Sequence, residues 1–295
     1  MKVLVTGSAG RVGRAIYIKL MKQHQVVGLD LTPCSTVDFV GDLSDNALIE
    51  RALEGVDTIV HTAALHAPHV GLAEDDEFER VNVKASVQIA LQGIKQGVKH
   101  IVYTSTTALY GAASTPPDKA GWIDEAVTPE PKTVYHRSKL AAENQLADIA
   151  TLFNIPLTIL RMSRCFPEPV DLMTAYRLTR GIDARDVASA HALAVAQRLS
   201  GVRRYIISGA TPFRQSDCAA LLRQAPKIII ERAPSLAAAF EQRHWPLPHS
   251  LDRVYDSALA QKELGWQPIH GFASVLALFD DELAEVLPVT SGKLT

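Results

Sequence analysis

Tyr135 and Lys139 stand four positions apart in the stretch Tyr135-His-Arg-Ser-Lys139. On a helix this spacing places both side chains on one face. The ammonium then stabilises a phenolate and lowers the pKa of the tyrosine from about 10 toward neutrality. A tyrosine tuned in this way exchanges a proton with a hydroxyl or a carbonyl. The pair predicts acid/base chemistry, although a packed ring beside a solvated charge on an amphipathic helix would leave the same two residues.

A cluster of hydroxyls precedes this helix. Thr104, Ser105 and Thr106 end the apolar run 99–107, which predicts a strand, and one of the three could hold the reacting oxygen beside the tyrosine. The segment 108–132 is rich in Gly and Pro, which is typical of an irregular loop over a site. Thr133 is expected to open the helix that carries the Tyr–Lys pair.

The N-terminal stretch supplies the elements for a second kind of chemistry. Residues 2–6 predict a strand, which breaks into Gly7, Gly10 and Gly13 before a helix over 11–22. Gly7 suits a tight turn, Gly10 lets the main chain approach a pyrophosphate, and Gly13 lets the helix pack closely. An ordinary strand-to-helix turn would explain the glycines alone. The next strand, over 25–30, ends in Asp30 at nearly the spacing that reaches ribose hydroxyls, which favours a dinucleotide site.

Polar and small residues follow the next two predicted strands. Asp42, after the strand 37–40, suits an adenine amino group or, equally, a turn; Ser44 or Asp45 is expected to cap the following helix. Small side chains at the end of the strand 56–61 let something flat approach the backbone. His66 and His69 come next, but no third ligand stands at zinc spacing, so we expect an active-site rim or a plain loop and no metal.

The remaining pattern alternates strands and helices. A long helix is predicted over 76–96, with Asn82 near its middle expected to bond to neighbouring backbone. Further elements are expected as strands over 156–161 and 203–208 and as helices over 184–199, 215–224 and 256–264. Such alternation predicts an α/β fold with a parallel, doubly wound sheet.

Composition narrows the possible partners. The chain has 295 residues, of which 47% are hydrophobic and 21% charged, as in an ordinary soluble globular protein. A net charge of -2 leaves no surplus for nucleic acid or an anionic membrane, and no apolar run nears the ~20 residues of a membrane span. Met1 leads straight into a strand, so no signal peptide is expected. Cys34, Cys165 and Cys218 match no metal or CxxC spacing and are interpreted as reduced thiols of a cytoplasmic protein.

Several motifs together resemble one family. They are Thr6-Gly-Ser-Ala-Gly-Arg-Val-Gly13 (TGxxGxxG), Gly41-Asp-Leu43, His61-Thr-Ala-Ala64 (HxAA), Tyr103-Thr-Ser-Thr-Thr-Ala-Leu-Tyr-Gly111, the YxxxK at Tyr135, Asp183-Ala-Arg-Asp-Val-Ala188, Asp252-Arg-Val-Tyr-Asp-Ser257 and Leu264-Gly-Trp266. On these residues the chain resembles an extended short-chain dehydrogenase/reductase of the NAD-dependent epimerase/dehydratase family. The resemblance implies a Rossmann-type sheet with a small C-terminal substrate-binding lobe, NAD as cofactor, and a homodimer built on the helices around 76–96 and 133–153.

The resemblance also implies roles for individual residues. Tyr135 becomes the acid/base, Lys139 its pKa partner and a ligand of the nicotinamide ribose, and Thr106 the hydroxyl that orients the substrate oxygen. The family usually has serine at this last position, so Ser105 stays open as the alternative. The implied cofactor-binding residues are Gly7, Gly10, Arg11, Val12, Gly13, Asp30, Asp42, Leu43, Ala63, Ala64, Asn82, Thr104, Tyr135, Lys139 and Cys165.

The middle of the chain bears on the substrate. Only 23 residues separate Arg161 from Arg185, whereas similar nucleotide-sugar epimerases carry longer insertions that hold the nucleotide. The run Arg161-Met-Ser-Arg-Cys-Phe-Pro-Glu-Pro169 instead is similar to uronate dehydrogenases, but Met173 stands where their carboxylate-binding arginine falls. Arg164 and Arg177 are nearby and could supply that fork. The predicted substrate-binding residues are His66, Thr106, Arg164 and Arg177.

These observations lead to one leading function and two alternatives. We expect hydride transfer between NAD and a hydroxyl or carbonyl of a small sugar, sugar acid or polyol. An epimerase or dehydratase that retains NAD, and a non-catalytic NAD-binding protein, are the alternatives. Residues 1–163 and 184–210 are assigned to the NAD-binding domain, 164–183 and 211–290 to the substrate-binding lobe, and 289–295 to a loose tail.

Overall fold

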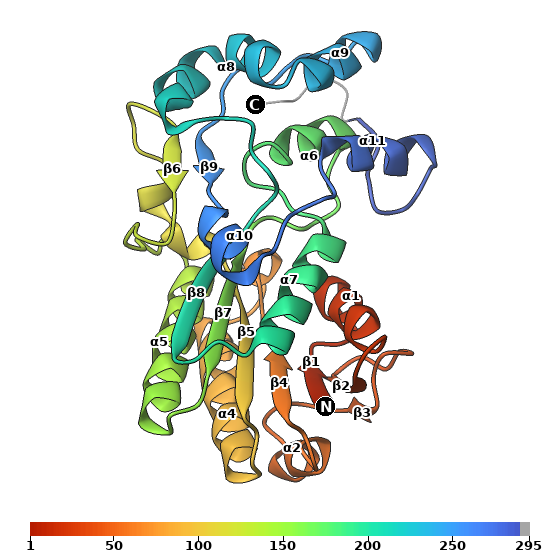
Figure 1. The fold of residues 1–295 in the computed structure, drawn as a ribbon, viewed down its shortest axis with the longest axis vertical. Coiled ribbons are helices and arrows are strands. Elements are labelled where there is room, and N and C mark those ends of the chain that lie inside the picture. The colour runs from red at the N-terminus through yellow and green to blue at the C-terminus, as the bar shows by residue number, and fades with distance from the viewer. Residues whose placement is uncertain (290–295) are drawn as a thin grey trace.

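The inner strand β1 (Lys2–Thr6) of the main sheet is apolar on both sides, because helices cover both faces. Val3 and Val5 of β1 pack with Ile16 on one face, whereas Leu4 packs with Ile49 and Ile89 on the other. The computed structural model describes residues 1–289 and shows this sheet beneath a smaller lobe (Figure 1). Its further strands are β2 (Gln25–Asp30), β3 (Phe39–Val40), β4 (Thr58–His61), β5 (His100–Thr106), β7 (Leu157–Met162) and β8 (Val202–Ile207).

The strand order of this sheet is β3-β2-β1-β4-β5-β7-β8, and every pairing is parallel. The chain therefore places β2 and β3 on one side of β1, then returns and places β4, β5, β7 and β8 on the other side. The crevice for a ligand in such a sheet lies outside the carboxyl ends of the strands at this reversal, between β1 and β4. The doubly wound parallel fold predicted from the sequence is confirmed.

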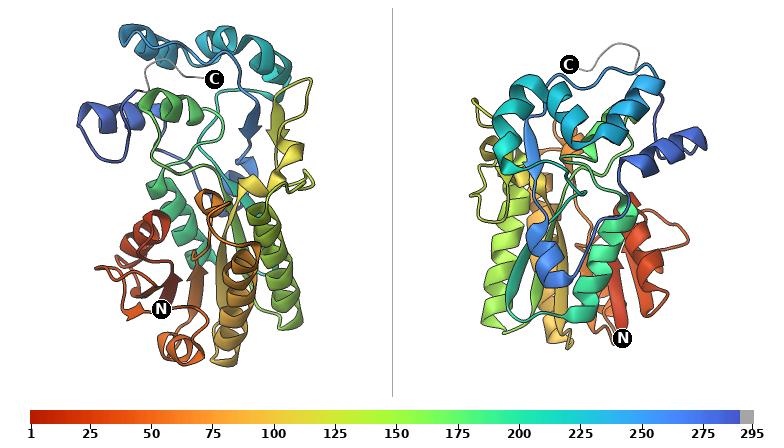
Figure 2. Two further views of the ribbon diagram at one scale, coloured as in Figure 1. Left: turned by 180° about the vertical axis from the view of Figure 1, so that it is seen from behind. Right: turned by 45° about the horizontal axis from the view of Figure 1, so that its top comes forward.

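Two layers of helices cover the sheet. One layer contains α1 (Arg11–Leu20), α7 (Ala184–Gln197) and α10 (Ala258–Leu264). The other contains α2 (Asn46–Ala52), α4 (Ala85–Lys95) and α5 (Val134–Leu152), and the view from behind in Figure 2 shows α4 and α5 side by side in front of the sheet. Asp45 caps α2 by accepting from the N–H of Ala47 and Leu48, and Thr133 caps α5 through His136, as the sequence predicts.

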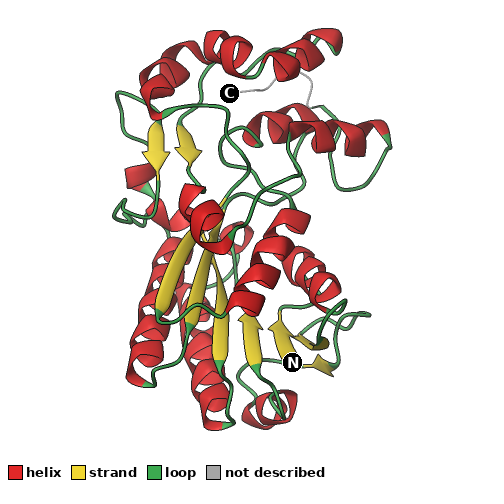
Figure 3. Cartoon of the chain, in the orientation of Figure 1, coloured by secondary structure: helices red, strands yellow, loops and turns green. Residues whose placement is uncertain are grey.

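A lobe lies over the carboxyl edge of the sheet (Figure 3). It is built from α6 (Val170–Tyr176), α8 (Cys218–Arg232), α9 (Pro234–Gln242), α11 (Phe272–Asp280) and the parallel pair β6 (Gly121–Ile123) and β9 (Arg253–Tyr255). β6 comes from the range assigned above to the NAD-binding domain, yet it pairs with β9 of the lobe. Conversely, α10 falls in the range assigned to the lobe and packs on the main sheet through Ala260 and Leu264.

The structure also departs from the predicted elements. The helix expected over 76–96 consists of α3 (Asp75–Phe78), a π-helical segment Glu79–Lys84, and α4. Helices α6, α9 and α11 are present where the sequence pattern gave no prediction, and α8 runs past Pro226 after a kink at Gln224. Of the tail expected over 289–295, residues 290–295 lie outside the described part of the chain. Within residues 1–289, no helix is both long and apolar enough to cross a membrane.

Candidate active site

A cavity of about 700 Å³ lies at the carboxyl ends of the strands, beneath the lobe. This volume is in the range of cofactor and substrate pockets. The structure brings most of the predicted site residues into its lining: Gly7, Gly10, Arg11, Val12, Gly13, Asp30, Asp42, Leu43, Ala63, Ala64, His66, Thr104, Thr106, Tyr135, Lys139, Arg164 and Cys165. Asn82 and Arg177 are the two predicted residues that do not line it.

The glycine turn between β1 and α1 forms one end of the cavity. Gly7 has a φ of 70°, and a Cβ there would lie 2.7 Å from the backbone nitrogen of Ala63. A Cβ at Gly13 would lie 2.0 Å from the carbonyl oxygen of Gly7. A side chain at either position would therefore collide with the backbone of the protein itself. The turn thereby carries the start of α1 directly to the edge of the cavity.

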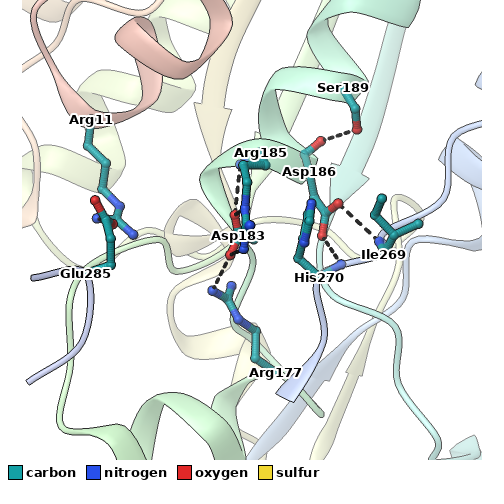
Figure 4. Close-up of polar contacts among 9 residues, drawn as sticks. All are labelled: Arg11, Arg177, Asp183, Arg185, Asp186, Ser189, Ile269, His270 and Glu285. Carbon is teal, nitrogen blue, oxygen red and sulfur yellow. Dashed lines mark hydrogen bonds and ion pairs between the residues drawn. The ribbon is translucent and has the colours of Figure 1, made fainter. Parts of the chain in front are cut away.

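The N-terminus of α1 fits a phosphate group. Among residues 1–289, no side chain caps this helix at Gly10, so the N–H groups of its first turn keep their donor capacity. The helix dipole favours negative charge at the same place. Arg11, the first residue of the helix, lines the cavity and pairs with Glu285, while its Nε is buried without a partner (Figure 4). The residues present therefore fit the pyrophosphate of a dinucleotide.

Two carboxylates follow β2 and β3. Asp30 accepts hydrogen bonds from the backbone N–H of Ala9 (3.0 Å) and Thr32 (2.9 Å), so its side chain is fixed at the end of β2. Asp42 is bound by both terminal nitrogens of Arg80, at 3.0 and 3.1 Å, a contact that the sequence did not indicate. The hydrogen bond from Arg80 lowers the pKa of Asp42 to about 2. The adenine role given to Asp42 stays a prediction, and Arg80 lines the cavity beside it.

Tyr135 and Lys139 project from the first turns of α5 into the cavity beside Thr106. Burial raises the pKa of Tyr135 to about 12, with the Thr106 hydroxyl acting in the opposite direction. Burial also lowers the pKa of Lys139 to about 7, although the carboxylate of Glu143 raises it. The expected lowering of the tyrosine pKa by the ammonium is therefore absent from this arrangement. Desolvation outweighs the pairing because both side chains lie inside the protein, where the charged forms are disfavoured.

The three hydroxyls near the end of β5 have different surroundings. Thr104 bonds through its hydroxyl to His191 of α7 at 2.8 Å, and its carbonyl oxygen accepts from Lys139 Nζ at 2.7 Å. The oxygen of Ser105 is buried and has no hydrogen-bond partner among the described residues. Thr106 accepts from the N–H of Ala108 and lies against Tyr135. Thr106 is thus the hydroxyl placed beside the tyrosine, whereas Thr104 positions Lys139 through its main chain.

Asn82 does not line the cavity but bonds to elements that do. Its amide bonds to the N–H and carbonyl of Leu65, at 2.8 and 3.0 Å, and to Ser138 on α5. The sequence predicts this bonding of Asn82 to neighbouring backbone. Asn82 lies in the π-helical segment Glu79–Lys84. Asn82 therefore fixes the loop after β4 against the helix that carries Tyr135, and it has no direct access to the cofactor cavity.

The predicted arginines are placed differently from one another (Figure 4 shows Arg177). Arg164 lines the cavity, pairs with Glu168 and lies over the rings of Phe166 and Tyr176. Arg177 is 2% exposed and bonds to Asp183, which also binds Arg185. The substrate role expected for Arg177 is therefore corrected to a structural one, because its guanidinium is enclosed between α6 and the start of α7.

The structure adds residues that the sequence did not single out. The lobe contributes Phe166, Tyr176, Arg180, Arg253 and Tyr255 to the cavity. Arg253 and Tyr255 belong to the stretch Asp252–Ser257, which carried part of the family resemblance, so that motif was the available signal. His66 lines the cavity and its ring packs against those of His69 and Phe166. In residues 1–289, no three His, Cys, Asp or Glu side chains are grouped so that they could hold a metal ion.

Comparisons with known proteins agree with this geometry. The model of the "NAD dependent epimerase/dehydratase family" matches residues 3–173. The UDP-glucose 4-epimerase of Neisseria meningitidis serogroup C is 29% identical over 166 residues, which are 50% of this chain and 48% of that protein. Sterol demethylase protein B of Methylococcus capsulatus is 32% identical over 158 residues, 50% of this chain and 46% of that protein. The chain thus matches about half the length of these curated relatives.

Similar solved structures cover nearly the whole chain. The structure of MoeE5 in complex with UDP-glucose and NAD has a TM-score of 0.70 and 22% identity, covering 96% of this chain and 99% of that one. The UDP-glucose 4-epimerase of Bifidobacterium longum, in complex with NAD+ and UDP, has a TM-score of 0.69 and 21% identity, covering 94% and 96%. At these identities the likeness establishes the fold.

Three buried histidines, His61 and His191 near the site and His100 at the amino end of β5, predict a loss of stability in acid. Burial lowers the pKa of His61 to about 3 and of His100 and His191 to about 4, each from 6.5. Between about pH 6.5 and 4 the unfolded chain binds protons that the folded chain does not, so the free energy of unfolding falls as the pH is lowered. Each unit of pKa shift corresponds to about 1.4 kcal/mol per histidine. Urea unfolding at a series of pH values measures this.

Two variants control that measurement. His100→Gln removes one of the titrating groups and should make the pH dependence shallower. His249→Gln, at an exposed position, should leave it unchanged. A free energy of unfolding that stays constant over this pH range would contradict the prediction.

Proposed function

The chain belongs to the NAD-dependent epimerase/dehydratase family, and from this premise we propose that it is an NAD-dependent oxidoreductase acting on a small sugar, sugar acid or similar polyol. The reaction is the transfer of a hydride between NAD and a hydroxyl or carbonyl of the substrate. The observation that carries the proposal is that Tyr135, Lys139 and Thr106 line the same cavity as the glycine turn and Asp30. A group suited to proton transfer and a turn suited to a dinucleotide thus line one cavity.

The residues divide between the two ligands. The N-terminus of α1 and Arg11 would hold the pyrophosphate, Asp30 the adenosine ribose, and Lys139 the nicotinamide ribose. Bound NAD supplies the hydride acceptor or donor. Burial raises the pKa of Tyr135 to about 12, so its phenol is the proton donor when a substrate carbonyl is reduced. When a substrate hydroxyl is oxidised, the phenolate form of Tyr135 accepts the hydroxyl proton as the hydride leaves for NAD, and Thr106 helps to orient the substrate oxygen in both directions.

An epimerase or dehydratase that retains its NAD is the second candidate. The UDP-glucose 4-epimerases among the relatives favour it. The short segment between Arg161 and Arg185 favours a small substrate instead, because no long insertion is present there to hold a nucleotide. Incubation with NAD and a panel of free sugars and sugar acids separates the two, since only a dehydrogenase forms NADH stoichiometrically with product.

We infer from the cysteines that the protein is cytoplasmic. Cys34, Cys165 and Cys218 are all free, and Cys165 and Cys218 are buried. Free thiols suit the reducing environment of the cytoplasm.

Replacing Tyr135 by Phe should reduce turnover at least ~100-fold, because the phenol that transfers the proton is lost while the ring keeps its packing. Affinity for NAD should change little. Steady-state kinetics together with NAD titration by fluorescence measures both quantities. Tyr17→Phe, on α1 but outside the cavity lining, is the matched control and should keep full activity. A Tyr135→Phe variant with near-normal turnover would refute the mechanism.

Asp30 should make the protein prefer NAD over NADP. Its carboxylate accepts from the 2′-hydroxyl and repels a 2′-phosphate, and Leu31-Thr-Pro33 offers no cation beside it. Competitive binding of the two cofactors measures the preference. Asp30→Asn, which removes the charge and keeps the shape, should narrow it. Equal affinities for both cofactors in the wild type would exclude this role for Asp30.

A homodimer through α4 and α5 is the proposed assembly. These helices carry the exposed apolar side chains Leu91 (41%) and Leu152 (78%), followed by Phe153 (49%). Sedimentation velocity at micromolar concentration should detect a dimer, and Leu91→Glu should shift it to monomer. Leu72→Glu, at a leucine that is 87% exposed in the loop between β4 and α3, should not. A wild-type protein that is monomeric at that concentration would contradict the proposed homodimer.

A further inference from the structure

The lobe side of the cavity contains more arginines than carboxylates. Arg164, Arg180 and Arg253 all line it. Glu168 pairs with Arg164, and Asp252 is shared by Arg180 and Arg253. Three guanidinium groups thus face two carboxylates. The unbalanced positive charge lies in a partly enclosed space, where its attraction for an anion is stronger than on an open surface.

Arg180 has side-chain N–H groups that make no hydrogen bond within the described chain. Its Nη1 donates to both oxygens of Asp252, at 2.9 and 3.2 Å, and its Nε and Nη2 donate to no other residue of the described chain. Arg253, by contrast, uses Nε and Nη2 on Asp252 and Nη1 on Ser114. A bidentate contact requires two neighbouring N–H groups, and Arg180 can offer them.

The guanidinium of Arg180 is also held in place. It stacks on the ring of Tyr176, with 4.3 Å between its Cζ and the ring centroid. Its main chain is fixed by hydrogen bonds to Tyr176 (2.9 Å) and from Arg164 (2.9 Å). The side chain is 25% exposed, so it is neither free in solvent nor closed off from the cavity. A group ordered in this way loses little conformational entropy when it binds.

The other arginines are less suited. Arg164 is 47% exposed on its side chain and already pairs with Glu168. Arg177 is enclosed with Asp183. Met173, which stands where uronate dehydrogenases have their carboxylate-binding arginine, is buried in the lobe core with 5% exposure. Arg180 therefore remains as the available cation on this wall.

We propose that Arg180 determines substrate specificity by binding an anionic group, a carboxylate or a phosphate, of the molecule whose hydroxyl or carbonyl faces Tyr135. This inference rests on the proposed function and adds the substrate class to it. Tyr176 and Asp252 orient the guanidinium. A neutral sugar of the same shape lacks the bidentate contact and binds more weakly.

The test compares ligands that differ in one group. Isothermal titration calorimetry on the NAD-loaded protein is carried out with glucose, glucuronate and glucose 6-phosphate, and with galactose and galacturonate. At least one charged compound should bind roughly 10- to 100-fold more tightly than its neutral counterpart. The glucuronate and 6-phosphate arms distinguish a carboxylate from a phosphate ligand.

Variants assign that preference to Arg180. Arg180→Gln should remove it while leaving the affinities for NAD and for the neutral sugars unchanged, and Arg180→Lys should restore part of it. Arg203→Gln is the control, because it removes the same charge on the outer strand β8. A wild-type protein without any preference for charged compounds, or an Arg180→Gln variant that keeps it, overturns the proposal.

The outcome is separable from that of the proposed function. Binding is measured without turnover, so an Arg180-dependent preference in a protein that forms no NADH would support this proposal alone. NADH formation that is equal for charged and neutral sugars would support the proposed function and overturn this one.

Discussion

The close packing of β1 against β4 at their carboxyl ends is the constraint on which the site depends. The hydroxyl of Thr6 contacts His61 Nδ1 at 2.6 Å and accepts from the N–H of Thr62 and Ala63. His61 Nε2 contacts Ser86, whose hydroxyl donates to the carbonyl of Asn82. This buried chain of hydrogen bonds joins the glycine turn, the end of β4 and the π-helical segment. It holds the three elements that border the cofactor cavity at one fixed separation.

Burial decides the electrostatics of the reacting groups. Lys139 is 3% exposed, donates to the Thr104 carbonyl, and lies 4.1 Å from the centroid of the Tyr103 ring. Glu143 is fully buried but is bound by Arg161 through two nitrogens, so most of its charge is already balanced. Lys139 consequently has only weak support for its charged form. The same desolvation keeps Tyr135 protonated, which gives the site a proton donor at neutral pH.

The lobe gives the cavity its chemical character away from the glycine turn. Its cavity-lining residues come from the stretch 164–180, which includes α6, and from β9, which lies far from that stretch in the sequence. Arg180 and Arg253 meet at Asp252 only because β9 runs beside β6 and because the loop after α6 folds back on the end of β7. The positive charge of this wall is thus a property of the assembled lobe.

The sequence by itself determined the sheet, its winding and the residues at the strand ends. Apolar strands of four to seven residues between helical repeats can bury their side chains only in a covered parallel sheet, and a Gly7 or Gly13 side chain would collide with backbone. Local signals such as Thr133 and Asp45 likewise act within a few residues and could be recognised. Tyr135, Lys139 and the glycine turn were therefore placed correctly in one cavity.

Tertiary structure decided which charged groups reach that cavity and what their pKa values are. Arg164 and Arg177 looked equivalent by sequence distance, yet one lines the cavity and the other is enclosed with Asp183. The Tyr135–Lys139 spacing indicated a shared helix face but not its burial, which reverses the expected shift of the tyrosine pKa. Desolvation and ion pairing depend on atoms brought together from distant parts of the chain, and local spacing carries no information about them.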